Sequence, residues 1–111
     1  ICTAAQEHHT RAHVFTHISH VYPTGSSIYT TYVFPLGSSP EATLQTWQAM
    51  KSAASRTVTS HGGTISHQHG VGIDHVPYLA AEKGESGIAA MRALFTHFDP
   101  EGMMNPGKLV I

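Results

Sequence analysis

Two early stretches of the chain, residues 12–22 and 28–34, are rich in β-branched and aromatic residues, which is typical of strands. Between them, residues 23–27 contain Pro23 and Gly25. These favour a turn, because proline fixes φ and glycine accepts a positive φ. We predict that the two stretches pair as an antiparallel β-hairpin.

Alternation along the second stretch separates its side chains into two faces. One face carries Ile28, Tyr32 and Phe34, and the other carries Tyr29, Thr31 and Val33. We interpret the first face as core and the second as a candidate working surface.

Apolar residues then recur at helical spacing. We predict a helix that begins with a Ser38 cap, Pro40 in the first turn and Glu41 completing a capping box. It runs to about Thr59, and the glycines at 62–63 end it.

The remaining elements are shorter. Residues 1–9 are interpreted as the tail of a helix, and 64–67 are long enough for a third strand. A short helix over 77–82 ends at Gly84, and a last helix covers 88–98. The order β-β-α-β-α predicts an α+β fold, an antiparallel sheet with helices packed on one face.

Composition narrows the class of function. The chain has 111 residues, of which 12% are charged, and its net charge is −1, which argues against a nucleic-acid surface. A single cysteine, Cys2, excludes an intrachain disulfide framework, and the apolar runs are too short for a membrane span. The chain is unusually rich in histidine, since its ten histidines outnumber all lysines and arginines together. Because the chain begins with Ile1 and not with Met, we expect it to be a piece of a longer protein.

The densest group of chemically active residues lies at 61–72, where glycines flank His67 and His69. In an extended backbone, side chains two residues apart leave the same face. Such a pair suits a site that places two neutral bases or donors against one planar or anionic group. The alternative is a solvated, histidine-rich loop.

A metal site would need three or four converging ligands. The available nitrogens belong to histidines on two segments: His13, His17, His20, His67 and His69. Their spacing matches no closed metal site, and strand alternation places His13 and His17 on the face opposite His20. We therefore predict no metal.

Tyr29 is the strongest single candidate for chemistry. A phenol beside imidazoles can donate or accept a proton where its charged form is stabilised. The alternative is an interface tyrosine whose hydroxyl is simply hydrogen-bonded. We assign Tyr22, Tyr32 and Trp47 to the core.

Three segments, residues 20–29, 62–72 and 98–109, together resemble FAD-linked oxidases of the vanillyl-alcohol-oxidase type. Within that superfamily the resemblance is strongest to the alkyldihydroxyacetonephosphate synthase family. It implies an N-terminal FAD-binding domain, outside this chain, and a ferredoxin-like C-terminal cap domain with a curved antiparallel sheet. Residues 1–98 would be the C-terminal part of the cap, and 99–111 a tail returning to the FAD-binding domain.

The resemblance also implies roles for residues. Tyr29 matches the family's active-site tyrosine and would be the general acid or base. His67 and His69 match the first and third histidines of a Ser-His-His-His-Gly-Val-Gly run, while Gln68 replaces the middle one. Asn105, Lys108 and His69 would lie near the FAD.

The implied reaction exchanges the acyl group of acyl-dihydroxyacetone phosphate for a long-chain alcohol through a flavin adduct, a step of ether-lipid synthesis. FAD would be held mainly by the absent domain, so we expect the fragment alone to be inactive. The expected partners are that domain and a lipid or other small-molecule substrate, with a homodimer as one option and no nucleic acid. The expected location is the cytoplasm, with peripheral membrane attachment as an option.

Two alternatives stay open. The first is an FAD-dependent dehydrogenase of D-2-hydroxy acids, of the glycolate or D-lactate type, which shares the tail. Its family binds a divalent metal through two strand histidines and the Glu of a Glu-His-Gly run; here Gln68 replaces that Glu, and Tyr29 falls about where a metal histidine is expected. The second is a free-standing, histidine-rich metal-binding module, which would need no upstream domain.

Overall fold

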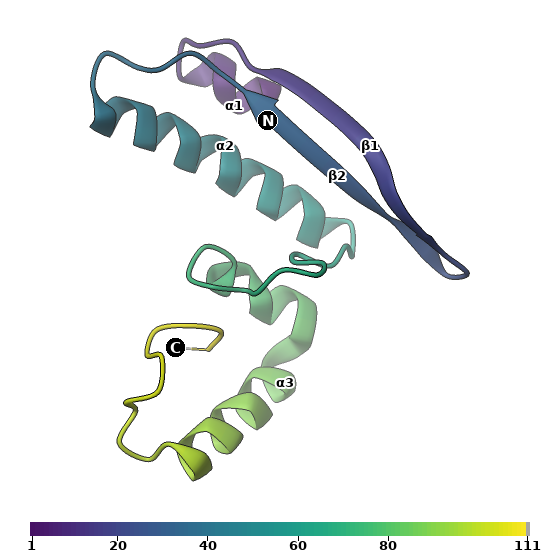
Figure 1. Cartoon of the computed structure of the whole chain (residues 1–111), viewed down its shortest axis with the longest axis vertical. Coiled ribbons are helices and arrows are strands. Elements are labelled where there is room, and N and C mark those ends of the chain that lie inside the picture. Colours follow the sequence, from purple (N-terminus) through teal and green to yellow (C-terminus); the bar gives the residue numbers. More distant parts are fainter. Residues whose placement is uncertain (111) are drawn as a thin grey trace. The chain divides into compact units, whose positions relative to one another are not determined.

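The computed structural model describes residues 1–110 and divides into two compact units, Ile1–Ala54 and Ser55–Ile111, each treated by itself below. Within the described residues the elements are two strands and three helices, labelled in Figure 1: α1 (Cys2–Glu7), β1 (His13–Tyr22), β2 (Gly25–Val33), α2 (Pro40–Ser60) and α3 (Val76–Phe98). The predicted α+β class is confirmed. None of these helices is both long and apolar enough to cross a membrane.

The predicted hairpin is confirmed: β1 and β2 pair antiparallel as a long ribbon (Figure 1). The pair Tyr22↔Gly25 leaves only Pro23 and Thr24 as the turn. The second strand therefore begins at Gly25, three residues earlier than predicted, because a two-residue turn allows pairing to resume at once.

A β-bulge interrupts this register. Ile18 pairs with Ile28 and His20 pairs with Ser27, so Ser19 is an extra residue on β1. One extra residue shifts the alternation of everything after it. Consequently the prediction that His13 and His17 lie on the face opposite His20 is wrong; the bulge brings all three to one face of the hairpin.

The core of the first unit is small. Ala4 and Ala5 of α1 and Met50 of α2 are buried, and Tyr32 and Phe34 pack against them. The short alanine side chains leave room for these aromatic rings. Burial raises the pKa of the Tyr32 phenol, because the phenolate would be desolvated. Tyr32 and Phe34 thus confirm the predicted core face.

Two other residues that were predicted to lie in the core, Ile28 and Tyr22, are exposed. Ile28 shares the alternation of Tyr32 but is 68% exposed, because it lies toward the turn, beyond the reach of the buried cluster. Tyr22 is also exposed, so its assignment to the core is wrong. Trp47 is half-buried, and the Lys51 ammonium lies 5.9 Å from its ring centre.

Both ends of α2 are fixed by local hydrogen bonds. The cap is Ser39 and not Ser38 as predicted: the Ala42 N–H donates to Ser39 Oγ at 3.2 Å. The pKa of Glu41 is lowered by its own backbone N–H and by the Ser39 hydroxyl. At the other end the Gly63 N–H donates to the Val58 carbonyl at 2.9 Å, and Gly62 has φ 70°, so the predicted glycine end is confirmed.

In the second unit α3 bends at Gly84, whose φ of 70° and ψ of 163° are not helical. The two predicted helices separated by Gly84 are therefore confirmed as two arms of one element. Leu79 on one arm and Ile88 on the other are its buried residues. Residues 64–67, by contrast, form no strand, so the predicted third strand is wrong.

Replacing Met50 by alanine should destabilise the first unit, since its side chain is fully buried in a core with few other large residues. The expected loss in the free energy of unfolding is about 2–5 kcal/mol, from lost burial and the cavity left behind. Leu44→Ala on the same helix is the matched control, because Leu44 is 51% exposed. Denaturant unfolding measures both; equal losses for the two variants would contradict this description of the core.

Candidate functional site

Tyr29 lies on the hairpin face opposite Tyr32, as predicted, and is 51% exposed. It pairs across the sheet with His17, and the two rings stack with their centres 5.4 Å apart and their planes 25° apart. Cross-strand neighbours of this kind restrict each other's side-chain rotation. The rotation of the Tyr29 ring is therefore restricted, while about half of the residue stays exposed.

The bulge also brings His20 to the hairpin face that carries Tyr29 and His17. His20 Nδ1 lies 3.1 Å from Ser19 Oγ and 3.3 Å from Ser27 Oγ, and its ring stacks on Tyr22 at 6.3 Å between centres. Sequence reasoning missed this cluster because strict alternation assigns His20 to the other face. No pattern in the sequence marks Ser19 as an extra residue.

The histidine run of the second unit forms a closed turn and not an extended segment. The Ser66 hydroxyl donates to the His69 carbonyl at 2.7 Å and lies 3.3 Å from that of Gly70, and Gln68 has a left-handed φ of 62°. Such a local bond competes with strand pairing. The expectation that His67 and His69 leave one face of an extended backbone is therefore wrong; both lie exposed on the turn.

A carboxylate on α3 anchors the segment before this turn. The Ile65 N–H donates to Glu82 Oε2 at 2.8 Å, and Lys83 Nζ lies 2.6 Å from Glu82 Oε1. Desolvation of the Glu82 side chain, which is only 14% exposed, raises its pKa. The hydrogen bonds from Lys83 and Ile65 and the Lys83 charge outweigh that effect, so the pKa of Glu82 is lowered overall.

The C-terminal tail folds back within the second unit. Asp99 accepts hydrogen bonds from the Met103 and Met104 N–H groups at 3.0 and 2.7 Å. Further on, the Leu109 N–H reaches the Gly72 carbonyl at 3.5 Å, which joins the tail to the end of the histidine run.

This fold-back produces an open cavity of about 800 Å³ between the tail and the last arm of α3. Its wall includes Phe95 and Phe98, the cation of Arg92, and both predicted cofactor residues, Asn105 and Lys108. Sequence reasoning missed Arg92, which no motif singled out. An amide, two cations, the Asp99 carboxylate and aromatic rings offer hydrogen bonds and a stacking surface to a planar polar group such as a flavin edge.

The predicted residues thus fall into two sets. Tyr29 belongs to the first unit, whereas His67, His69, Asn105 and Lys108 belong to the second. That the two sets meet over one cofactor stays a prediction. Among residues 1–110, no three or more His, Cys, Asp or Glu side chains are grouped to hold a metal ion.

Comparison with known proteins decides the family. The model of the family described as "FAD linked oxidases, C-terminal domain" matches residues 1–109. The chain belongs to this family. It is 32% identical to the alkyldihydroxyacetonephosphate synthase of Trypanosoma brucei brucei and 30% identical to that of Dictyostelium discoideum. The two matches cover 94% and 89% of this chain, and 17% and 16% of the relatives.

A second group of relatives matches a shorter region. The glycolate oxidase subunit GlcD of Bacillus subtilis (strain 168) is 50% identical over 48 residues, which cover 43% of this chain and 10% of that protein. The chain thus spans about a sixth or less of the curated relatives named here. No solved structure gives a significant match.

Replacing Glu82 by alanine should loosen the histidine run, because the Ile65 N–H loses its acceptor. The expected cost is about 1–3 kcal/mol in unfolding free energy. Glu85→Ala is the matched control on the same helix, since Glu85 is exposed, and it should cost less than about 0.5 kcal/mol. Chemical denaturation compares them, and indistinguishable stabilities would remove Glu82 as an anchor.

The same carboxylate predicts a direction of pH dependence. Its pKa in the folded protein lies below the ordinary value of 4.5, so folding favours the charged form. The stabilisation is fully present above about pH 4.5 and is lost as the pH falls through the lower, folded-state value. On acidification, the free energy of unfolding should fall less in Glu82→Gln than in the natural protein. An equal fall in the two proteins would contradict the lowered pKa of Glu82.

Proposed function

We propose that this chain is the C-terminal part of the substrate-covering domain of an FAD-dependent enzyme of the alkyldihydroxyacetonephosphate synthase type. The proposal depends mainly on Tyr29, which is half exposed and whose ring stacks on that of His17. It is supported by the extent of the synthase matches, which cover nearly the whole chain, whereas the glycolate oxidase match covers less than half.

In this proposal Tyr29 transfers the proton at its Oη. A free phenol holds its proton at neutral pH, so useful basicity requires a positive charge or a donor near the oxygen. His17 stacks on the ring and positions it. In the proposed exchange a long-chain alcohol replaces the acyloxy group of acyl-dihydroxyacetone phosphate, which leaves as a fatty acid. The hydroxyl proton of the alcohol must pass to the departing carboxylate, and Tyr29 would relay it.

His67 and His69 have a different task. Each imidazole can donate a hydrogen bond to an oxygen where negative charge develops. The Ser66 hydroxyl fixes the turn that carries them, so their backbone positions are set before substrate arrives. Gln68 between them can orient a group but cannot move a proton.

FAD, when bound, would supply an electron-accepting ring system. Asn105 and Lys108 are the residues of this chain suited to hold it, because they share one cavity with Arg92 and two phenylalanines. A lysine or arginine beside such a ring stabilises negative charge on it. No glycine-rich phosphate-binding loop occurs in the sequence, so the rest of the cofactor would be bound by another domain.

The hairpin supports the presence of such a domain. Toward the turn, Ile18, Val21 and Ile28 are largely exposed, although alternation and the bulge place them with Tyr32 and not with Tyr29. An exposed apolar patch of this kind marks a surface that another part of the protein covers. The relatives, about six times longer than this chain, contain enough sequence for one.

A second candidate function is the FAD-dependent oxidation of a D-2-hydroxy acid. The 50% identity to the Bacillus subtilis glycolate oxidase subunit over 48 residues favours it. Gln68 counts against it, because a neutral amide is a weaker metal ligand than a carboxylate.

In the full-length protein, Tyr29→Phe should lower turnover by about 10²–10⁴-fold, the usual contribution of a positioned acid or base. The bound flavin, read from its absorbance, should be unchanged. Tyr32→Phe is the matched control, since it removes the same hydroxyl from the opposite face of the same strand. Activity of Tyr29→Phe equal to that of the control would end the catalytic role of Tyr29.

Substrate tests separate the two candidate functions. The full-length protein should exchange the acyl group of acyl-dihydroxyacetone phosphate and leave glycolate, D-lactate and D-2-hydroxyglutarate unoxidised. Elemental analysis should find less than one zinc or manganese per chain. Rapid oxidation of a hydroxy acid together with one metal ion per chain would establish the dehydrogenase instead.

A further inference from the structure

The bulge at Ser19 builds a cluster of polar side chains near the turn of the hairpin. His20 Nδ1 lies 3.1 Å from Ser19 Oγ and 3.3 Å from Ser27 Oγ, and the two hydroxyls are hydrogen-bonded to each other. The cluster joins both strands, because Ser27 on β2 is the cross-strand partner of His20 on β1. The His20 ring also stacks on that of Tyr22, with the planes 7° apart. The orientation of the imidazole is therefore set both by hydrogen bonds at Nδ1 and by a stacked ring.

This cluster is adjacent to Tyr29 on the same face of the hairpin. Ser27 and Tyr29 are two residues apart on β2, so their side chains share a face and their Cα atoms lie about 7 Å apart along the strand. His20, which pairs with Ser27, is consequently the diagonal cross-strand neighbour of Tyr29. Side chains of aromatic size reach one another across such a diagonal. A ligand at the Tyr29 hydroxyl can therefore contact the His20 ring as well.

The bulge itself points to a function for His20. A β-bulge leaves one residue unpaired and interrupts the ladder, and bulges are frequent next to active sites, where they redirect a side chain. The first side chain of β1 that this bulge redirects is His20, because it follows Ser19 directly. The interrupted ladder is thus what brings an imidazole beside a phenol.

The proposed exchange needs both an acceptor and a donor of protons. The incoming alcohol must lose its hydroxyl proton, and the departing carboxylate must gain one. A phenol suits the second task because it holds its proton at neutral pH, and for the same reason it is a poor acceptor for the first. A histidine side chain accepts a proton near neutral pH. The relay through Tyr29 therefore requires a partner that takes the proton of the alcohol.

We propose that His20 is this partner, a second catalytic residue beside Tyr29; the inference rests on the proposed function. In this role the Nδ1–H group donates to the serine oxygens, which places the basic lone pair on Nε2. Ser19 and Ser27 are then positioning residues. Their hydrogen bonds to Nδ1 strengthen when the ring becomes positively charged.

The proton transfers balance over one exchange. His20 Nε2 takes the hydroxyl proton as the alcohol oxygen bonds to the carbon that the acyloxy group leaves. Tyr29 Oη gives its proton to the carboxylate as the old carbon–oxygen bond breaks. The imidazolium of His20 then returns one proton to Tyr29 Oη, which restores both side chains.

His20→Gln in the full-length protein with bound FAD tests the proposal. Glutamine keeps a polar side chain of similar length but cannot take a proton. The kcat for exchange with a long-chain alcohol should fall about 10²–10⁴-fold, the usual contribution of a positioned acid or base, with KM little changed. The melting temperature and the flavin absorbance should match those of the natural protein, since His20 is exposed.

The acidity of the alcohol separates proton transfer from a merely structural role. Two fluorine atoms on the carbon next to the one that bears the hydroxyl make an alcohol more acidic, so it needs less help from a base. The loss caused by His20→Gln should therefore be smaller with the fluorinated alcohol, by a factor of about ten. A structural defect would slow the exchange of both alcohols by the same factor.

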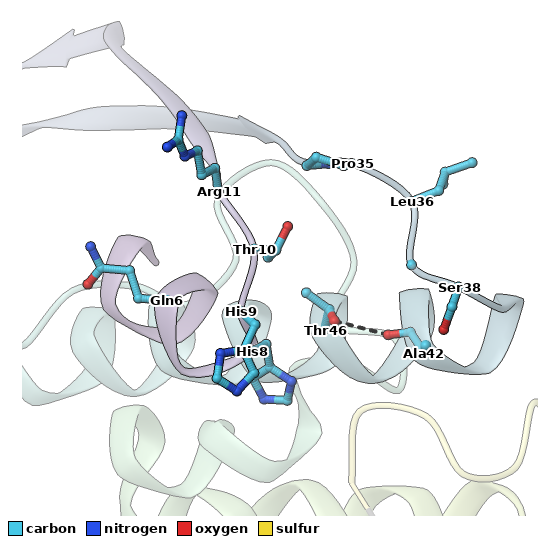
Figure 2. A pocket seen from close by; sticks show the side chains of 11 residues that line it. Gln6, His8, His9, Thr10, Arg11, Pro35, Leu36, Ser38, Ala42 and Thr46 are labelled. Atoms are coloured by element: carbon cyan, nitrogen blue, oxygen red, sulfur yellow. Dashed lines mark hydrogen bonds between the residues drawn. The ribbon is translucent and has the colours of Figure 1, made fainter.

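His8→Gln is the matched control, because it makes the same substitution at an exposed histidine of the same unit. His8 lines a cavity between the end of α1 and the start of α2 (Figure 2), at the end of the hairpin opposite its turn. The rates of this variant with both alcohols should equal those of the natural protein.

The proposal is overturned if His20→Gln exchanges acyl groups as fast as His8→Gln, or if its losses with the two alcohols are equal. Both results leave the proposed function intact, because the natural protein still performs the exchange. A natural full-length protein that performs no exchange would refute the proposed function, and with it this role of His20.

Discussion

The register of the hairpin, with its single extra residue at Ser19, is the constraint on which the site in the first unit depends. Pairing places His17 against Tyr29, and the bulge moves His20 to the same face. Without the bulge, His20 would share the opposite face with Ile18 and Ile28. The inserted residue therefore adds His20 to the face that already carries His17 and Tyr29.

Side chains that bind backbone groups have the equivalent role in the second unit. Glu82 accepts the Ile65 N–H, the Ser66 hydroxyl closes the following turn, and Asp99 caps the tail. The segment and tail carrying the predicted histidines and cofactor residues have no strand or helix of their own to hold them. Their positions instead depend on a few specific hydrogen bonds, each worth about 1 kcal/mol, which makes this part of the molecule sensitive to single substitutions.

The sequence predicted those features that arise from local chemistry. The hairpin, the glycine end of α2 and the bend at Gly84 all follow from residues that favour one backbone conformation. Predictions from the sequence were wrong where the backbone conformation depends on strand pairing or on the hydrogen-bond partner of a side chain. No residue type marks the bulge at Ser19. The strand expected at 64–67 does not form, because the Ser66 hydroxyl closes a turn there. Tyr29 was a candidate from its strand face and its chemistry, and family resemblance added its role. Asn105 and Lys108 came from the resemblance alone, whereas the cavity that they share with Arg92 is seen only in the folded chain.

We expect that in the full-length protein Tyr29 and the histidine turn lie beside a flavin bound by another domain. A crystal structure of the full-length protein with FAD is the decisive measurement. It should show the Tyr29 hydroxyl and the rings of His67 and His69 lining one pocket over the same side of the isoalloxazine, with Lys108 near its edge. A structure in which Tyr29 and the histidine turn face separate regions of solvent would contradict it.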